Sequence, residues 1–287
     1  TFDFSGGTLS GNSPMRVASQ FNWSGGTLSA TDSNVTTAVS STLCTNTNHF
    51  LIRRTLINQG TITWPSGDWY FSDGAIIRNL SGSVIDIQGN NYFGYNVGSV
   101  PRFINKGTLK KTAGTGVTTV QIQSADTNAV FQIQSGTMSF NSNSNYINSD
   151  FNLSNGKLQF NGGIQTLDNQ SDITGTGSVF FPGGTITLNG TFIATDSTQF
   201  TGATVNFNKS VSSFGSKIAI TAGTVNVNTG DSVIVSVINQ SGGTANVNMN
   251  DSIIVSTFNL SGGTLSGNSP MRVASQFNWS GGTLSAT

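Results

Sequence analysis

The chain alternates apolar and polar residues over short stretches that glycine interrupts. Phe151 and Leu153 flank a polar residue, and Leu158 and Phe160 repeat the alternation after an Asn-Gly-Lys bend. A period of two residues is typical of a β-strand with one buried face, whereas an amphipathic helix repeats its apolar positions every three or four residues. Glycine supplies the positive φ that a sharp corner requires. The pattern therefore predicts short strands joined by Gly/Asn corners.

The unit apolar-x-apolar-Ser-Gly-Gly-Thr-apolar recurs along the chain, with clear copies that begin at Phe21, Phe151 and Phe258. Successive corners lie about 20 residues apart, with several longer intervals, and such a repeat length is typical of solenoids with inserted loops. The predicted corner glycines are Gly7, Gly26, Gly60, Gly107, Gly136, Gly223, Gly243, Gly263 and Gly282.

Stacking explains how such short units become stable. Stacked units pair as parallel strands and bury one continuous column of Phe, Leu, Ile and Val, whereas a single unit cannot bury its apolar face. We expect residues 1–287 to form one all-β domain, a right-handed parallel β-helix with about 20 or more residues per coil and roughly 12–14 coils. The right-handed sense follows from the handedness of parallel crossovers. Residues 28–60 are irregular and are expected to form either a degenerate coil or an inserted loop.

A second repeat is much longer. Residues 1–31 and 257–287 differ at only two positions, where Asp3 corresponds to Asn259 and Phe4 to Leu260. The offset of 256 residues predicts one period of a tandem array followed by the start of the next. The chain also opens within the pattern, without an initiator Met or a signal peptide, as an excised or processed segment would.

The composition excludes several classes of protein. Gly, Asn, Ser and Thr number 35, 32, 39 and 37 and make up half of the 287 residues, Glu is absent, and only 8% of residues are charged. Helix-forming surface residues are too scarce for a helical protein, and the zero net charge argues against disorder and against nucleic-acid binding. No apolar run is long enough to span a membrane. Low charge suits a stack, because a charge copied into every coil would face itself about 5 Å away.

The repeated unit, together with Asn58-Gln-Gly-Thr-Ile62 and Phe103-Ile-Asn-Lys-Gly-Thr-Leu109, resembles the right-handed β-helix repeats of large bacterial surface proteins of the adhesin, haemagglutinin and autotransporter-passenger types. The resemblance covers nearly the whole chain. It implies secretion and an extracellular, cell-surface or filament setting. We expect a structural, non-enzymatic segment without a cofactor. The duplicated ends make further copies of the chain its expected partners, and surface polysaccharide is a second class of partner.

Catalytic chemistry has one local candidate. Cys44 and His49 lie five residues apart and could act as nucleophile and base, or they could be two unrelated loop residues. One His and one Cys cannot make a metal cluster at the usual spacings. A lone cysteine forms no intramolecular disulfide, so Cys44 leaves only an intermolecular bond open.

Two groups of residues are candidates for contact with carbohydrate or with an anionic polymer. Aromatic rings can stack on sugars, and paired carboxylates can hydrolyse glycosidic bonds; edge packing and solvated ion pairs are the alternative. The candidate glycan contacts, possible sites of a lectin or a polysaccharide-degrading enzyme, are Trp64, Trp69, Tyr70, Asp73 and Asp86. The candidate anion patch, which could equally be a charged face of a neutral solenoid, is Arg102, Lys106, Lys110 and Lys111.

Two further features come from stacking. Asp231 and Asp251 occupy equivalent places in neighbouring coils, where they could share a calcium ion or simply cap turns. Outward threonines, with serine or asparagine two residues later, should form parallel ladders that resemble those of ice-binding β-solenoids, although outward threonine is also an ordinary strand residue. The ladder residues are Thr8, Thr224 and Thr244 with Ser10, Asn226 and Asn246, and the expected interruptions are Lys110 and Lys157.

Overall fold

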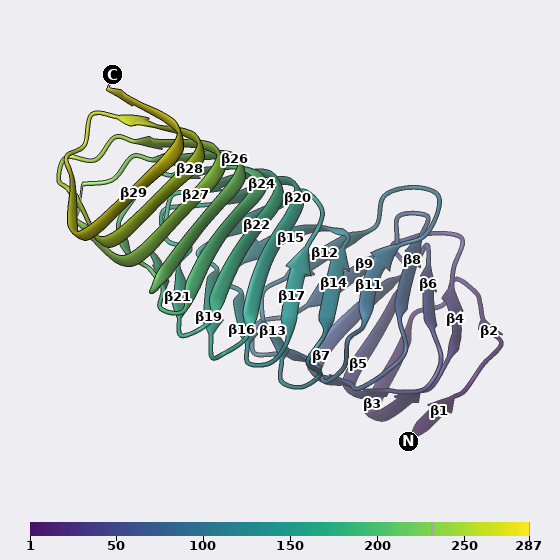
Figure 1. Cartoon of the computed structure of the whole chain (residues 1–287). Helices are drawn as coiled ribbons and strands as arrows, with labels where there is room; N and C mark the ends of the chain where they lie inside the picture. Colours follow the sequence, from purple (N-terminus) through teal and green to yellow (C-terminus); the bar gives the residue numbers. More distant parts are fainter. Residues whose placement is uncertain (231, 287) are drawn as a thin grey trace. The chain divides into compact units, whose positions relative to one another are not determined.

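The computed structural model describes residues 1–230 and 232–286 (Figure 1). It confirms the predicted fold class, because the regular structure is entirely β and forms a parallel β-solenoid of about 14 coils spaced roughly 20 residues apart. The right-handed sense remains a prediction. The described residues contain no helix long and apolar enough to cross a membrane.

The coils belong to two compact units, Thr1–Ser149 and Asp150–Thr287. In the first unit the early coils have two strands each and the later coils have three. Its strands are β1 (Phe2–Phe4), β2 (Thr8–Leu9), β3 (Met15–Trp23), β4 (Gly26–Ser29), β5 (Thr36–Cys44), β6 (His49–Ile52), β7 (Thr55–Trp64), β8 (Trp69–Ser72), β9 (Ile76–Asn79), β10 (Val84–Ile87), β11 (Tyr92–Tyr95), β12 (Arg102–Asn105), β13 (Thr108–Lys111), β14 (Val117–Gln121), β15 (Gln123–Thr127), β16 (Val130–Ile133), β17 (Thr137–Phe140) and β18 (Ser144–Ile147).

The second unit is more regular, and its last three strands each run through a corner without a break (Figure 1). Its strands are β19 (Asp150–Leu153), β20 (Lys157–Leu167), β21 (Ile173–Gly175), β22 (Ser178–Leu188), β23 (Phe192–Ala194), β24 (Ser197–Phe207), β25 (Val211–Phe214), β26 (Lys217–Val227), β27 (Val233–Val247), β28 (Ile253–Gly267) and β29 (Met271–Ala286).

The irregular segment 28–60 contains a coil. Strands β5 and β6 pair with the coils on both sides, so that Thr27 lies beside Phe50 and Ser41 lies beside Thr61. The Gly-Thr corners at Thr27 and Thr61 therefore belong to different columns of the solenoid. The long interval between them reflects this change of column, which spacing counted along the sequence cannot reveal.

The predicted corner glycines divide into two kinds. Seven of the nine have φ between 57° and 96°, as a sharp corner requires. Gly60 and Gly107 do not have positive φ. A Cβ atom at Gly60 would lie 1.9 Å from the carbonyl oxygen of Ser40, and one at Gly107 would lie 2.3 Å from that of Ser83. At these two positions glycine is needed because neighbouring coils approach too closely for a side chain.

Stacked side chains fill the interior of each unit. In the second unit the rings of Phe160, Phe181 and Phe200 stack in successive coils, with centroids 5.9 and 5.2 Å apart. In the first unit Trp64, Trp69 and Phe93 pack together. The alternation read from the sequence thus places these apolar residues inward, where they pack on one another between coils.

Asparagine ladders add side-chain hydrogen bonds between coils. In the first unit the fully buried Asn58 donates to the side-chain oxygen of Asn79, and Asn79 donates to that of Asn105, each over 2.8 Å. In the second unit the half-buried Asn226 donates to Asn206 over 2.7 Å, and Asn246 donates to Asn226 over the same distance. The two ladders have the same chemistry but differ in burial.

This difference predicts unequal effects of two matched substitutions. Asn79→Ala removes one of the hydrogen bonds made by each of the buried side chains of Asn58 and Asn105 and should cost about 2–4 kcal/mol of unfolding free energy. Asn226→Ala removes two ladder bonds, but at a site that water reaches, and should cost less than about 1 kcal/mol. Urea unfolding of both variants measures the difference, and equal destabilisation would contradict the role assigned to burial.

Candidate functional site

Cys44 and His49 lie in the core of the first unit. The Nε2 atom of His49 is 2.6 Å from the carbonyl oxygen of Trp23, and its ring meets that of Trp23 edge-on at 4.9 Å. Burial raises the pKa of the Cys44 thiol and lowers the pKa of the His49 imidazole, so both groups are favoured in their neutral forms. A nucleophile needs the thiolate, and this environment disfavours it.

The predicted glycan contact through Trp64 and Trp69 is wrong. Both indoles are buried, and they pack on each other with ring centroids 5.1 Å apart. The Nε1 atom of Trp64 donates to the carbonyl oxygen of Gly67 over 2.6 Å. The neighbouring residues do not show whether each indole points into the core or toward solvent. Period-two alternation fits either orientation, and only the alignment of one coil with the next decides between them.

An outward aromatic column lies on the same coils. Phe50, Tyr70 and Tyr92 are half-buried and stack with ring centroids 5.4 and 5.5 Å apart. The hydroxyl of Tyr70 donates to the carboxylate of Asp68, and that of Tyr92 donates to the side-chain oxygen of Gln121. Of the predicted glycan contacts, only Tyr70 belongs to this column. Phe50 and Tyr92 were missed because only the coil register brings them beside it.

The remaining predicted acids form separate ion pairs. Asp73 lies 3.4 Å from Arg53, and Asp86 lies 3.3 Å from Lys110. Asp86 also accepts a 2.7 Å hydrogen bond from the hydroxyl of Thr112. These contacts match the ion-pair alternative, and they do not bring the two carboxylates together across a substrate.

The predicted anion patch loses two of its four members. Lys111 has no exposed surface, and its ammonium group donates to the carbonyl oxygens of Gly89 and Ala113 and to the hydroxyl of Thr118. Burial lowers the pKa of Lys111 to about 8. Lys110 is held by Asp86. Of the original four, Arg102 and Lys106 remain exposed.

A buried carboxyl group escaped the sequence analysis. Asp126 is 1% exposed and accepts a 2.6 Å hydrogen bond from the hydroxyl of Ser124, whose oxygen lies 2.9 Å from that of Ser144. Neither of the two ion pairs among the described residues involves it. Burial raises the pKa of Asp126 to about 8, against the smaller lowering effect of Ser124. The period-two alternation of Ser124 and Asp126 was a signal that both face the same side.

Metal binding receives no support from the described residues, which contain no group of three or more His, Cys, Asp or Glu able to hold an ion. Asp251 accepts a 2.7 Å hydrogen bond from the hydroxyl of Ser232 and a 2.8 Å bond from the backbone N–H of Ser252. This is the turn-capping alternative. Asp231, the other calcium candidate, lies outside the described residues.

The threonine ladder is longer than expected in the second unit. Threonines occupy one position in six successive coils, and Lys157 does not interrupt them because it pairs with Ser178 in another column. In the first unit Thr8 pairs with Thr27, and the column then continues with Phe50. The six residues are Thr185, Thr204, Thr224, Thr244, Thr264 and Thr283.

The duplicated segments have the same strand register. Phe2 pairs with Phe21 and Thr8 with Thr27 in the first unit, and Phe258 pairs with Phe277 and Thr264 with Thr283 in the second. Their surroundings differ. Trp23 is 1% exposed beneath the coil formed by β5 and β6, whereas its counterpart Trp279 is 56% exposed.

Comparisons with known protein families, with curated proteins and with solved structures found no match. The fold and the geometry of its surfaces are therefore the basis for a functional proposal.

The buried carboxyl group predicts a pH-dependent stability. Between about pH 4 and 8 the unfolded chain ionises Asp126 while the folded chain keeps it protonated, so the free energy of unfolding should fall by up to about 1.4 kcal/mol per pH unit. Below this range both states are protonated, and above it both are ionised. Asp126→Asn should remove this part of the decline, whereas Asp73→Asn should keep it. Urea unfolding across the range measures both, and an unchanged decline in Asp126→Asn would contradict the assignment.

Proposed function

We propose that this chain is a structural, non-catalytic repeat segment of a bacterial extracellular fibre or cell-surface adhesin stalk, extended by tandem repeats or by end-to-end stacking of coils. The duplicated segments carry the proposal. Within each of two segments of nearly the same sequence, 256 residues apart, one coil pairs with the next in the same register. A chain built in this way continues by repeating contacts that it already contains.

The side chains agree in detail between the two copies. Asn22 donates to Asp3 over 2.6 Å, and Asn278 donates to the equivalent Asn259 over the same distance. The rings of Phe2 and Phe21 stack at 5.5 Å, and those of Phe258 and Phe277 stack at 5.2 Å. The exchange of Asp3 for Asn259 is compatible with this ladder, because either side chain offers an oxygen that accepts the bond.

The exposed apolar side chains of the second copy support extension. Phe277, Trp279 and Leu284 are 43%, 56% and 41% exposed, whereas the corresponding Phe21, Trp23 and Leu28 are buried. Exposed apolar side chains that lie together are typical of an interaction surface. Another coil would bury it and would pair the open strand edge at the same time.

The bacterial cell-surface setting is the part of the proposal that depends on resemblance. The repeated unit resembles surface-protein repeats, and the zero net charge and uncharged Asn, Ser and Thr ladders suit a long stack of coils. These features are compatible with extension and support outside the cell.

A second candidate function, carbohydrate binding, has its own observation in the column of Phe50, Tyr70 and Tyr92. Three half-buried rings about 5.5 Å apart present an aromatic surface beside the carboxylate of Asp68. In this case Tyr70→Ala should reduce binding to a polysaccharide array, whereas Tyr95→Ala, at an exposed tyrosine outside the column, should not. Equal binding of the two variants would remove this candidate.

Electron microscopy of the purified chain tests the structural proposal. With about 14 coils of about 4.8 Å each, end-to-end stacking of the purified chain predicts fibres of uniform width with an axial repeat of about 67 Å. A tandem array with a period of 256 residues would instead repeat at about 60 Å. Trp279→Asp should suppress end-to-end association, while Tyr95→Asp, at a lateral exposed position, should leave it intact. Discrete particles at every concentration, with affinity for glycans, would contradict the structural proposal.

A further inference from the structure

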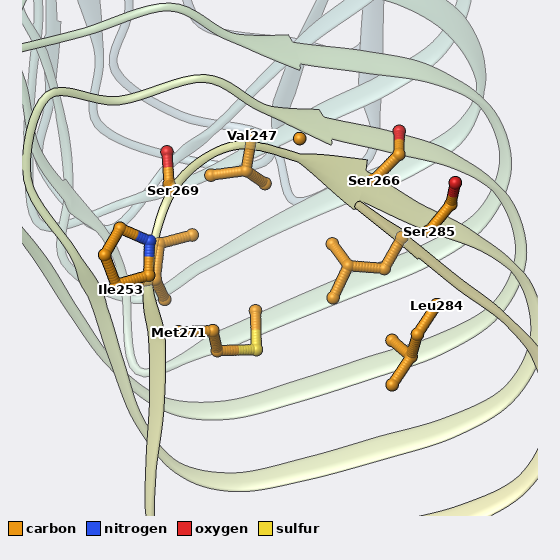
Figure 2. Close-up of a pocket in the computed structure, with 10 residues that line it drawn as sticks. Val247, Ile253, Ser266, Ser269, Met271, Leu284 and Ser285 are labelled. Carbon is orange, nitrogen blue, oxygen red and sulfur yellow. The ribbon is translucent and has the colours of Figure 1, made fainter. Parts of the chain in front are cut away.

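Two cavities in this protein are related by the 256-residue duplication. The first has a volume of about 220 Å³ and the second about 370 Å³ (Figure 2). Six residues of the first cavity recur at the corresponding positions of the second. The first is lined by Leu9, Ser10, Gly11, Ser13, Pro14 and Met15, and the second by Leu265, Ser266, Gly267, Ser269, Pro270 and Met271.

The first cavity receives a guanidinium group. Arg54 lines it and is only 3% exposed. Its Nη1 atom donates to the carbonyl oxygens of Gly11 and Ser29 over 3.0 and 3.2 Å, and its Nη2 atom donates to that of Ser13 over 3.1 Å. The residues that supply these three acceptors belong to the duplicated segment.

The other two acceptors of Arg54 come from the coil that follows the first copy. Its Nη2 atom also donates to the carbonyl oxygen of Thr36 over 3.4 Å, and its Nε atom donates to the hydroxyl of Thr37 over 2.6 Å. All five N–H donors of the guanidinium are therefore used, four of them on carbonyl oxygens. Neither ion pair among the described residues includes Arg54. The first cavity thus recognises a planar guanidinium by its donor geometry, which a lysine ammonium cannot reproduce.

The second cavity has a glycine in the same backbone conformation as the first. Gly11 and Gly267 have φ of 124° and 129°, a conformation that strongly favours glycine. Figure 2 shows Ser266, Ser269 and Ser285 around the second cavity, with Met271 and Leu284 on its apolar wall. Gly267, Ser269 and Ser285 are the counterparts of the three duplicated residues whose carbonyl oxygens accept from Arg54. No arginine among the described residues lines this second cavity.

We propose that the second cavity is a guanidinium-binding socket, and that its ligand is the arginine corresponding to Arg54 in the next copy of the repeat. The inference rests on the proposed extension by repeats and names the residue that makes the junction between copies. The same coil of the next copy would cover the exposed apolar cluster. In the first unit the coil formed by β5 and β6 places Cys44 beside Trp23 and Leu51 beside Leu28. The side chains of Trp23 and Leu28 are buried there.

The socket is tested on the full chain with methylguanidinium as the probe and methylammonium as its control. Nuclear magnetic resonance should show saturable shifts of the backbone amides of Gly267, Ser269 and Ser285 with methylguanidinium, and at least about tenfold weaker binding of methylammonium. The amides of Gly11 and Ser13 should not respond, because the guanidinium of Arg54 already occupies the carbonyl oxygens of these two residues. Absence of saturable shifts in the second copy, equal binding of the two probes, or an equal response of both copies would overturn the proposal.

Arg54→Ala supplies the matched control, since it opens the first cavity and should make Gly11 and Ser13 respond to methylguanidinium as their counterparts do. The measurement on the unsubstituted chain does not depend on whether this variant folds. A chain that binds methylguanidinium in the second copy but forms no fibres would contradict the proposed function and leave the socket standing. Fibres without methylguanidinium binding would contradict the socket and leave the proposed function standing.

The identity of the ligand is tested by adding the sequence of residues 32–64 after Thr287 of the full chain. With arginine at the position corresponding to Arg54, methylguanidinium should no longer shift Gly267 and Ser269, and the fluorescence of Trp279 should move to shorter wavelength as the added coil covers it. With alanine at that position the probe should still bind. Unchanged probe binding in the arginine version would overturn the assignment of this arginine as the ligand.

Discussion

Parallel, in-register pairing of successive coils is the constraint on which the rest of this structure depends. Each residue lies about 4.8 Å from the equivalent residue of the next coil, so every side chain is stacked on its counterpart. Positions that repeat in many coils therefore favour groups that can stack on similar groups. Phenylalanines do so through ring contacts at Phe160, Phe181 and Phe200, and asparagines do so through amide hydrogen bonds.

The same constraint explains how charge is used. A charge repeated at the same position of successive coils would repel its own copies. The described residues instead hold isolated charged groups, several of which have their own hydrogen-bond or ion-pair partners. Arg54 and Lys111 turn inward and use backbone carbonyl oxygens as acceptors, whereas burial favours the neutral form of Asp126. These buried polar groups fix particular coils to one another, and the apolar columns supply most of the driving force.

The sequence predicted the architecture because its period-two alternation and its corners near every 20 residues are local signals. It did not predict which column each corner occupies, and the long interval after Thr27 therefore looked irregular although β5 and β6 form a coil there. The same lack of register misplaced Trp64, Trp69 and Lys111, which are buried, and concealed the outward column of Phe50, Tyr70 and Tyr92. The socket depends on Arg54, whose hydrogen-bond acceptors lie 17 to 43 residues away along the chain, so that no local pattern marks it.

Hydrogen exchange of the shared sequence tests the dependence of each coil on its neighbours most directly. Peptides that correspond to both Gln20–Ser29 and Gln276–Ser285 have identical composition and arise in equal amounts from the two copies. Because β3 and β4 pair with coils on both sides while β29 pairs with β28, these peptides should divide into two mass envelopes of equal area, one well protected and one partly protected. A single envelope, with both copies equally protected in the monomer, would contradict the account.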